Sequence, residues 1–211
     1  METKSLIKKT SFGILLAGGL FILLNFGFFW ENLKYTLVKP AIKKETLSQT
    51  AKPAPKGKPN TLIIESLGLK LPVLYVDDTA ETTFQKALQK GVVHYPGTAK
   101  PGEYGNVYIF GHSSDNAWAK GEYKTAFALL PRIEKGAKLI LTNWNGNVFQ
   151  YIVTNTFVTS AKDTQLLDQN GYKKKQLTLQ TSYPIGTSLQ RYIVIGEIPE
   201  DTTPSQDPNA S

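Results

Sequence analysis

Short runs with strand-like alternation recur between residues 61 and 197, and turn signals such as NWNGN (143–147) and PGEYGN (101–106) separate them. Two short helical pieces, over 82–91 and 125–130, fit between the runs. Short strands with little helix predict a mainly β domain over residues 61–198, closed as a barrel or sandwich. The runs are TLIIES (61–66), KLPVLYV (70–76), NVYIFGH (106–112), AKLILT (137–142), NVFQYIVTNTFVT (147–159), QLTLQT (176–181) and RYIVIGE (191–197).

An uncharged stretch of twenty residues, SFGILLAGGLFILLNFGFFW (11–30), precedes this domain. At about 1.5 Å per residue it matches a hydrocarbon core of about 30 Å. It follows a lysine-containing segment (1–10) and ends in aromatic residues suited to a membrane interface. Charged residues follow Trp30 where a cleaved signal peptide would have small ones. The stretch therefore predicts one uncleaved transmembrane signal anchor, and lysines on both sides leave its orientation open by charge alone.

Residues 31–60 are predicted to form a basic stalk rich in Pro and Lys. The part PAIKKETLSQTAKPAPKGKPN (40–60) has few apolar residues and is typical of an extended, semi-stiff linker. The tail PEDTTPSQDPNAS (199–211) has the composition of disorder. The chain is thus predicted to consist of an anchor, a stalk, one folded domain and a tail.

The net charge of +7 is confined to the N-terminal part of the chain. Residues 1–60 hold ten lysines against three acids, a net +7, whereas residues 61–211 hold fourteen basic and fourteen acidic residues. A neutral domain without a basic stripe argues against nucleic acid as a partner. The chain has no cysteine, which excludes disulfides, thiolate metal sites and thiol catalysis in this sequence. No metal cluster or cofactor motif is evident, so neither is expected.

Three residues are candidates for chemistry. His112 ends a strand-like run in which Tyr108, Phe110 and His112 share a face, and a loop of small and polar residues follows. Arg191 opens an apolar strand, where a fixed guanidinium can meet an oxyanion. Ser182, in TLQTSYP (178–184), lies at the mouth of a strand. The other histidine, His94 in GVVHYPGT, is more typical of a structural residue.

These features combine into a pattern that resembles the sortases, closest to their class D group. The pattern consists of the anchor, the stalk, GVVHYPGTAKPGEYGNVYIFGHSS (91–114) and LTLQTSYPIGTSLQRYIVIG (177–196). The resemblance covers essentially all of 61–198. It implies a closed sortase-type β-barrel on the extracytoplasmic face of a bacterial cell membrane. It also implies a transpeptidase that cleaves LPXTG-like sorting signals between Thr and Gly and passes the acyl group to an amine of peptidoglycan or a pilin.

By this resemblance the histidine of the family falls on His112, its arginine on Arg191 and its nucleophilic cysteine on Ser182. A thiol ionises near pH 8.5 and can be tuned lower, whereas a hydroxyl needs a base during attack. Asp115 is close to His112 in sequence, but no spacing marks it as the carboxylate that orients a serine protease's histidine.

Three hypotheses follow from the serine. The chain is a sortase with its cysteine replaced, which binds sorting signals with little turnover. Alternatively, it is a serine variant that still carries out acyl transfer or hydrolysis. In the third hypothesis it is a non-catalytic, membrane-anchored module that binds sorting-signal peptides or wall components.

Overall fold

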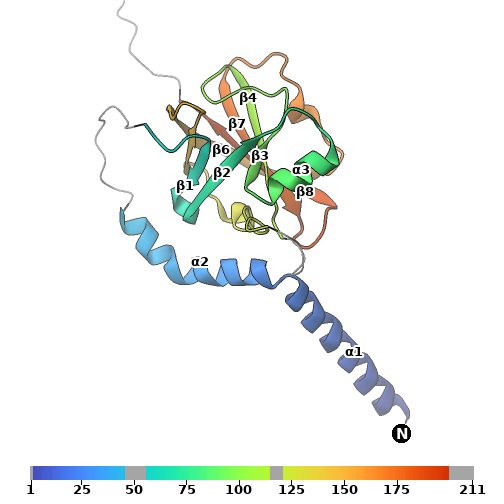
Figure 1. The fold of residues 1–211 in the computed structure, drawn as a ribbon. Coiled ribbons are helices and arrows are strands. Elements are labelled where there is room, and N and C mark those ends of the chain that lie inside the picture. The colour runs from blue at the N-terminus through green and yellow to red at the C-terminus, as the bar shows by residue number, and fades with distance from the viewer. Residues whose placement is uncertain (1, 46–55, 115–120, 200–211) are drawn as a thin grey trace, which may run out of the picture.

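The computed structural model describes residues 2–45, 56–114 and 121–199, and eight strands within these ranges form a closed barrel (Figure 1). The order around the barrel is β1-β2-β3-β4-β7-β8-β6-β5, and pairing of β1 with β5 closes it. The predicted mainly β, closed barrel with short helices is confirmed. The strands are β1 (Thr61–Ile64), β2 (Leu69–Tyr75), β3 (Val92–His94), β4 (Gly105–Phe110), β5 (Lys138–Thr142), β6 (Val148–Ser160), β7 (Lys175–Tyr183) and β8 (Gln190–Glu197).

The strand alternation places one set of side chains inside the barrel. On β7, Leu177 and Leu179 are fully buried in the main core, and on the adjacent β4 so are Val107 and Ile109. Removing such side chains from water is the main driving force for closing the barrel, at roughly 1.5–3 kcal/mol each. The intervening residues of β7 therefore face outward, as the alternation predicts.

Short helices cover the barrel, and one predicted helix differs. The helix α3 (Glu81–Leu88) agrees with the expected piece at 82–91. Residues 125–129 instead form turns that lead into the 3₁₀ helix η2 (Leu130–Arg132). Pro131 explains the difference, because it disfavours α geometry at the residue before it and has no N–H to donate. The other 3₁₀ helices are η1 (Glu65–Leu67) and η3 (Gln165–Leu167).

The N-terminal segment forms two helices, α1 (Glu2–Leu24) and α2 (Phe26–Glu45), where one helix over 11–30 was expected. The chain bends by 74° between them. Asn25 lies at the break, and its side-chain Nδ2 donates to the carbonyl of Phe21 (2.9 Å). No single helix in the described ranges is long and apolar enough to span a membrane, although 12–24 and 26–37 together pass by length and composition.

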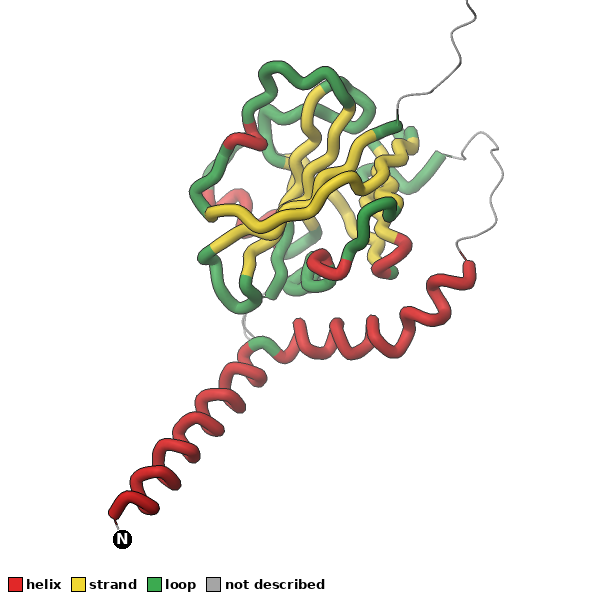
Figure 2. Tube along the Cα trace, turned by 180° about the vertical axis from the view of Figure 1, so that it is seen from behind, coloured by secondary structure: helices red, strands yellow, loops and turns green. Residues whose placement is uncertain are grey.

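The stalk predicted over 31–60 also differs at both of its ends. Its first part, 31–45, is helical because α2 continues from Phe26 to Glu45, through Pro40. Residues 56–60 run along the barrel, where the Gly57 N–H donates to the Gly146 carbonyl (2.9 Å). Residues 46–55 and 200–211, the middle of the stalk and nearly all of the predicted tail, lie outside the described residues. Figure 2 shows both helices outside the barrel.

His94 ends β3, a strand too short to recognise separately in the sequence. Its side chain is 5% exposed and stacks on Tyr75 with ring centroids 4.7 Å apart. Its Nε2 donates to the Ala99 carbonyl (2.9 Å). Burial lowers the pKa of His94 below its ordinary value. These contacts make His94 a packed, neutral residue of the barrel wall.

Truncating a core side chain of β7 should destabilise the barrel far more than truncating an exposed one of the same type. Leu179→Ala is expected to lower the free energy of unfolding by about 2–5 kcal/mol, because a fully buried leucine leaves a cavity. Leu189→Ala, at a side chain 73% exposed, should change it by less than about 0.5 kcal/mol. Urea denaturation of the full chain followed by circular dichroism measures both. Equal losses would contradict the assigned core.

Protonation of His94 should couple folding to pH. Its pKa is lower in the folded state, so the unfolded state binds more protons below the ordinary pKa of about 6.5. The stabilisation is therefore complete above that pH and is lost as the pH falls toward the folded pKa. His94→Gln should flatten this dependence in urea denaturation between about pH 5 and 7. The same pH slope in both proteins would contradict the prediction.

Candidate active site

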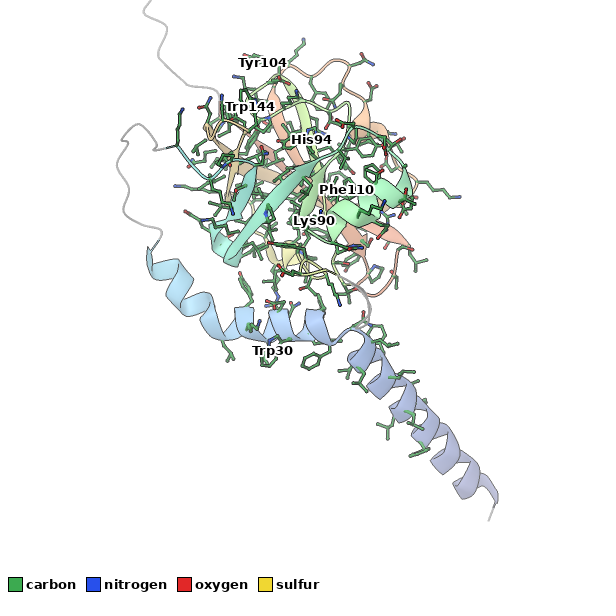
Figure 3. The ribbon with its side chains drawn as sticks, in the orientation of Figure 1. Trp30, Lys90, His94, Tyr104, Phe110 and Trp144 are labelled. Atoms are coloured by element: carbon green, nitrogen blue, oxygen red, sulfur yellow. The ribbon has the colours of Figure 1, made fainter. Side chains whose placement is uncertain are left out.

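A cavity of about 350 Å³ opens on the outer face of the barrel, at the ends of β4, β7 and β8. The first turns of α3 form one wall, and the connection between β6 and β7 forms another. Phe84 of α3 packs edge-on against Phe110 at the end of β4, with ring centroids 5.0 Å apart. Figure 3 shows Phe110 beside α3. The cavity therefore has an aromatic floor between a helix and the sheet.

All three residues singled out in the sequence, His112, Ser182 and Arg191, line this cavity. Ser182 of β7 and Arg191 of β8 are directly opposite in the antiparallel register. In such a pair the Cβ atoms are about 4.5–5.5 Å apart and the side chains share a face. Each of the three residues is half-buried, so each is shielded by the wall yet open to a ligand.

His112 reaches the cavity through the parallel pairing of β4 with β7. Phe110 is opposite Gln180 in that register, and His112 and Ser182 each lie two residues further along. The Gly111 N–H donates to the Gln180 carbonyl (3.1 Å), which extends the ladder past the last strand residue. The Thr181 hydroxyl donates to the Gly111 carbonyl (2.8 Å). These bonds hold His112 level with Ser182.

The chain beyond His112 is also held in place. The carbonyl of His112 accepts a bond from the N–H of Phe127 (2.9 Å), a fully buried residue. Two residues on, the Ser114 hydroxyl oxygen accepts from the N–H of Gly186 in the loop between β7 and β8 (3.1 Å). Both loops that border the cavity are therefore bonded to neighbouring structure.

The Arg191 guanidinium is fixed by its own hairpin. Its Nη1 donates to the carbonyls of Ser188 and Gln190, each at 3.0 Å. A guanidinium has five N–H donors and stays protonated at any physiological pH. Two donors position the group, and the remaining capacity suits an oxyanion or a peptide carbonyl.

Asp163 adds a negative charge that the sequence did not single out. It lines the cavity from the connection after β6. The hydroxyl of Thr159 donates to its carboxylate (2.6 Å), as does the N–H of Gln165 (3.1 Å), and these bonds lower the pKa of Asp163. In the sequence Asp163 belongs to an ordinary polar turn, so only the fold shows that it lines the cavity.

Tyr108 contributes a neutral polar group to the same cavity. Burial raises the pKa of its phenol, so the hydroxyl stays protonated and donates to Oε1 of Gln180. This bond joins β4 to β7 below Ser182. Asp115, the acid nearest His112 in sequence, lies outside the described residues. Within the described ranges no group of three or more His, Asp and Glu side chains is arranged to hold a metal ion.

Comparison with known proteins identifies the family of the barrel domain. A family model for the sortase domain matches residues 62–198. Sortase D of Bacillus subtilis (strain 168) is 29% identical over 178 residues, which cover 79% of this chain and 81% of that protein. The solved structure of a Clostridium perfringens sortase D5 transpeptidase is 25% identical with a TM-score of 0.54, over 80% of this chain and 93% of that one.

Sortase E from Streptomyces avermitilis is 29% identical with a TM-score of 0.52, over 70% of this chain and 91% of that one. Each of these three matches covers at least four fifths of the relative's own length. The family model alone covers more than half of the chain, from Leu62 in β1 to Ile198 just after β8. The chain belongs to the sortase family.

Proposed function

We propose that this sortase is a membrane-anchored transpeptidase of the class D type. It cleaves LPXTG-like sorting signals between Thr and Gly and joins the acyl product to an amine of peptidoglycan or of a pilin. The observation that carries the proposal is the convergence of His112, Ser182 and Arg191 on one cavity. The similarity to sortase D of Bacillus subtilis and to the Clostridium perfringens sortase D5 supports the class.

In this mechanism the side chain at 182 is the nucleophile. Its oxygen, or sulfur in a cysteine form, bonds to the carbonyl carbon of the threonine, and the Thr–Gly C–N bond breaks. His112 takes the proton of the nucleophile and returns it to the departing glycine amine. Arg191 stabilises the oxyanion that forms on the way. The acceptor amine then attacks the acyl carbon, the bond to residue 182 breaks and its proton passes through His112.

The serine at 182 makes the first step slow in this proposal. Arg191, directly across the hairpin, provides a fixed positive charge that favours a thiolate. A hydroxyl ionises far less readily and depends on the base alone during attack. In this proposal the protein with Ser182 therefore binds sorting signals and turns over slowly, which is the first of the three hypotheses. The non-catalytic module remains the alternative, because the position of the nucleophile holds oxygen.

Restoring sulfur at position 182 should restore transpeptidation. Ser182→Cys, mixed with an LPXTG-like peptide and an amine acceptor, is expected to form product on the order of 10³-fold faster than the serine form. Mass spectrometry of the ligated peptide and of the acyl-enzyme measures it. Leu189→Cys adds a thiol to the exposed loop between β7 and β8 and should stay at the serine rate.

His112→Ala in the Ser182→Cys background should abolish turnover, since it removes the proton carrier. If Ser182→Cys forms no product but still binds the peptide, the non-catalytic module is favoured. If Ser182→Cys neither forms product nor binds the peptide, the proposed activity is overturned. Comparable rates for the serine and cysteine forms would instead support an active serine enzyme.

The helix α1 is the apolar arm of the bent pair, 12–24 and 26–37, that together has the length and composition of a membrane span, and it is proposed as the membrane anchor, with the barrel on the extracytoplasmic face. Its side chains over 12–24 are nearly all apolar and exposed, as expected of a helix surrounded by lipid. The full chain should remain in the membrane pellet after an alkaline carbonate wash, whereas a chain that begins at Phe26 should be released. Protease added to intact protoplasts should digest the barrel. Protection of the barrel until lysis would contradict the orientation.

A further inference from the structure

The helix α2 has a continuous apolar face that no other part of the described chain covers. Trp30 is 47% exposed, Leu33 52% and Leu37 72%. At 100° per residue the members of this face fall within an arc of about 100°. Figure 3 shows Trp30 on the side of α2 away from the barrel. The face, called here the apolar face of α2, consists of Phe26, Phe29, Trp30, Leu33 and Leu37.

The opposite side of α2 is bound to the barrel. Tyr35 is 6% exposed and belongs to the main hydrophobic core. Arg132, which ends η2, donates from Nε to Oδ1 of Asn32 (2.6 Å) and from Nη1 to the Thr36 hydroxyl (3.3 Å). Its guanidinium carbon also lies 5.3 Å from the centre of the Tyr35 ring. The orientation of the apolar face is therefore set by the barrel.

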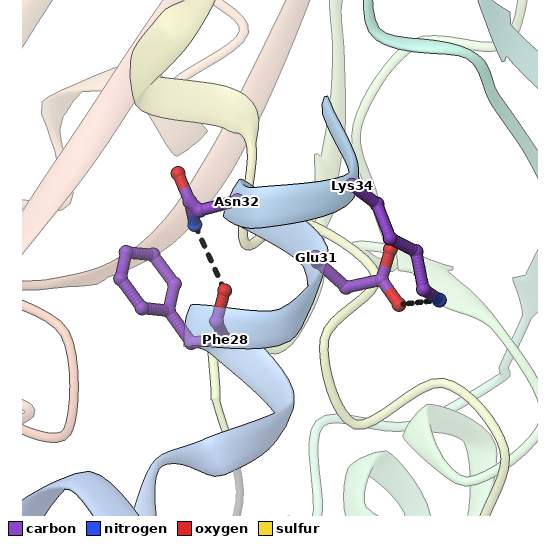
Figure 4. Close-up of polar contacts among 4 residues, drawn as sticks. All are labelled: Phe28, Glu31, Asn32 and Lys34. Atoms are coloured by element: carbon purple, nitrogen blue, oxygen red, sulfur yellow. Dashed lines mark hydrogen bonds and ion pairs between the residues drawn. The ribbon is translucent and has the colours of Figure 1, made fainter. Parts of the chain in front are cut away.

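The charged and aromatic side chains of α2 indicate the kind of surface that fits this face. Lys34 lies at its edge, with Nζ 5.5 Å from the centre of the Trp30 ring, and is paired with Glu31 (2.8 Å), as Figure 4 shows. The sequence of α2 holds four lysines against two glutamates. Tryptophan beside lysine on an apolar helix face is typical of the headgroup region of an anionic bilayer. The face begins at Phe26, directly after the break that follows α1, the apolar helix proposed as the anchor.

We propose that α2 lies flat in the headgroup region of an anionic bilayer, with its apolar face toward the acyl chains. The barrel is then clamped to the membrane surface through Arg132 and Tyr35. At Asn25 the chain turns by 74° and α1 enters the hydrocarbon, as the relative directions of α1 and α2 in Figure 1 allow. This inference rests on the proposed membrane anchoring and adds a second, interfacial contact that fixes the orientation of the barrel.

The clamp also reaches the candidate active site. Gly186, four residues after Ser182, approaches the helix break so closely that a Cβ on it would lie 2.7 Å from Oδ1 of Asn25. The same residue is bonded to Ser114 in the loop after His112. The point where α1 meets α2 thus touches the loop that borders the cavity, and the cavity is held at a fixed height above the bilayer.

Because the chain has no cysteine, single cysteines can report depth without background. The full chain is reconstituted in vesicles of phosphatidylcholine and phosphatidylglycerol and labelled with an environment-sensitive fluorophore at Leu33→Cys. The label should shift to the blue and be quenched by lipids that carry a spin label near the headgroup. Tyr104→Cys is the matched control, since this residue is 71% exposed and lies on the opposite side of the barrel from Trp30 (Figure 3). Its label should stay in water.

A second variant tests the clamp itself. Arg132→Ala removes both hydrogen bonds to α2 and leaves the apolar face intact. The Leu33→Cys label should remain in lipid, while energy transfer from a label on the barrel to a dye in the headgroups should broaden because the barrel is released. Unchanged transfer in Arg132→Ala, and again in Arg132→Ala combined with Tyr35→Ala, would overturn the clamp.

The outcomes separate this inference from the anchoring on which it rests. A chain that fails to float with the vesicles overturns the membrane anchoring. A chain that floats while its Leu33→Cys label stays in water overturns the inference alone. Unlabelled Leu33→Cys is also oxidised after dilution into excess lipid. A high yield of disulfide-linked dimers there assigns the face to a second copy of the chain and overturns the inference too.

Discussion

The candidate active site depends on one strand, β7, which pairs with β4 on one side and β8 on the other. The first pairing joins segments seventy residues apart, Gly105–Phe110 and Lys175–Gln180. Closing so long a loop costs little more than closing one of half its length, because this entropy grows slowly with length. A register slip of one residue would turn the side chain of Ser182 inward and point that of Thr181 or Tyr183 outward in its place. The full burial of Leu177 and Leu179 opposes that slip, so the core sets the face on which Ser182 lies.

A buried polar network fixes the connection that carries Asp163. The Thr178 hydroxyl donates to Oδ1 of Asn106 (2.8 Å), and Nδ2 of Asn106 donates to the Leu166 carbonyl (2.7 Å). Gln169 accepts a further bond from the Asn106 N–H (3.0 Å). Both Asn106 and Thr178 are fully buried, and leaving either unpaired would cost about 1–3 kcal/mol. The network ties the wall of the cavity to β4 and β7, so the acidic wall and the strand that carries Ser182 form one rigid unit.

Much of this arrangement is accessible from the sequence, and the exceptions have physical causes. Alternation located most of the strands and put Tyr108 and His112 on one side, because half-buried strands must alternate. It did not find β3, whose three residues are too few to alternate. It also did not find Asp163, because the turn that holds it becomes a cavity wall only through pairing of distant strands. The family resemblance predicted that His112, Ser182 and Arg191 share one site, and all three line the cavity. Their catalytic roles stay predictions.

The helix α2 shows the same limit more sharply. The sequence predicts that the apolar residues up to Trp30 belong to the anchor and that Leu33 and Leu37 belong to the stalk, because composition does not distinguish a helix in lipid from one lying on it. The two kinds of helix differ in what the other side of the helix contacts, and in α2 that side is bound to the barrel. Arg132 lies one hundred residues from Asn32 in the chain, and no local pattern announces that contact.

With α2 in the headgroup region as proposed, the barrel, the cavity and the bilayer become one fixed assembly. A sorting signal that is itself tethered near the membrane would then meet the cavity within a thin layer above the bilayer instead of in bulk solution. Confinement of this kind raises effective concentration without any new contact, provided the height of the cavity matches the reach of the tether. The contact of Asn25 with Gly186 is where that height is set, because it joins the helix break to the loop that follows Ser182.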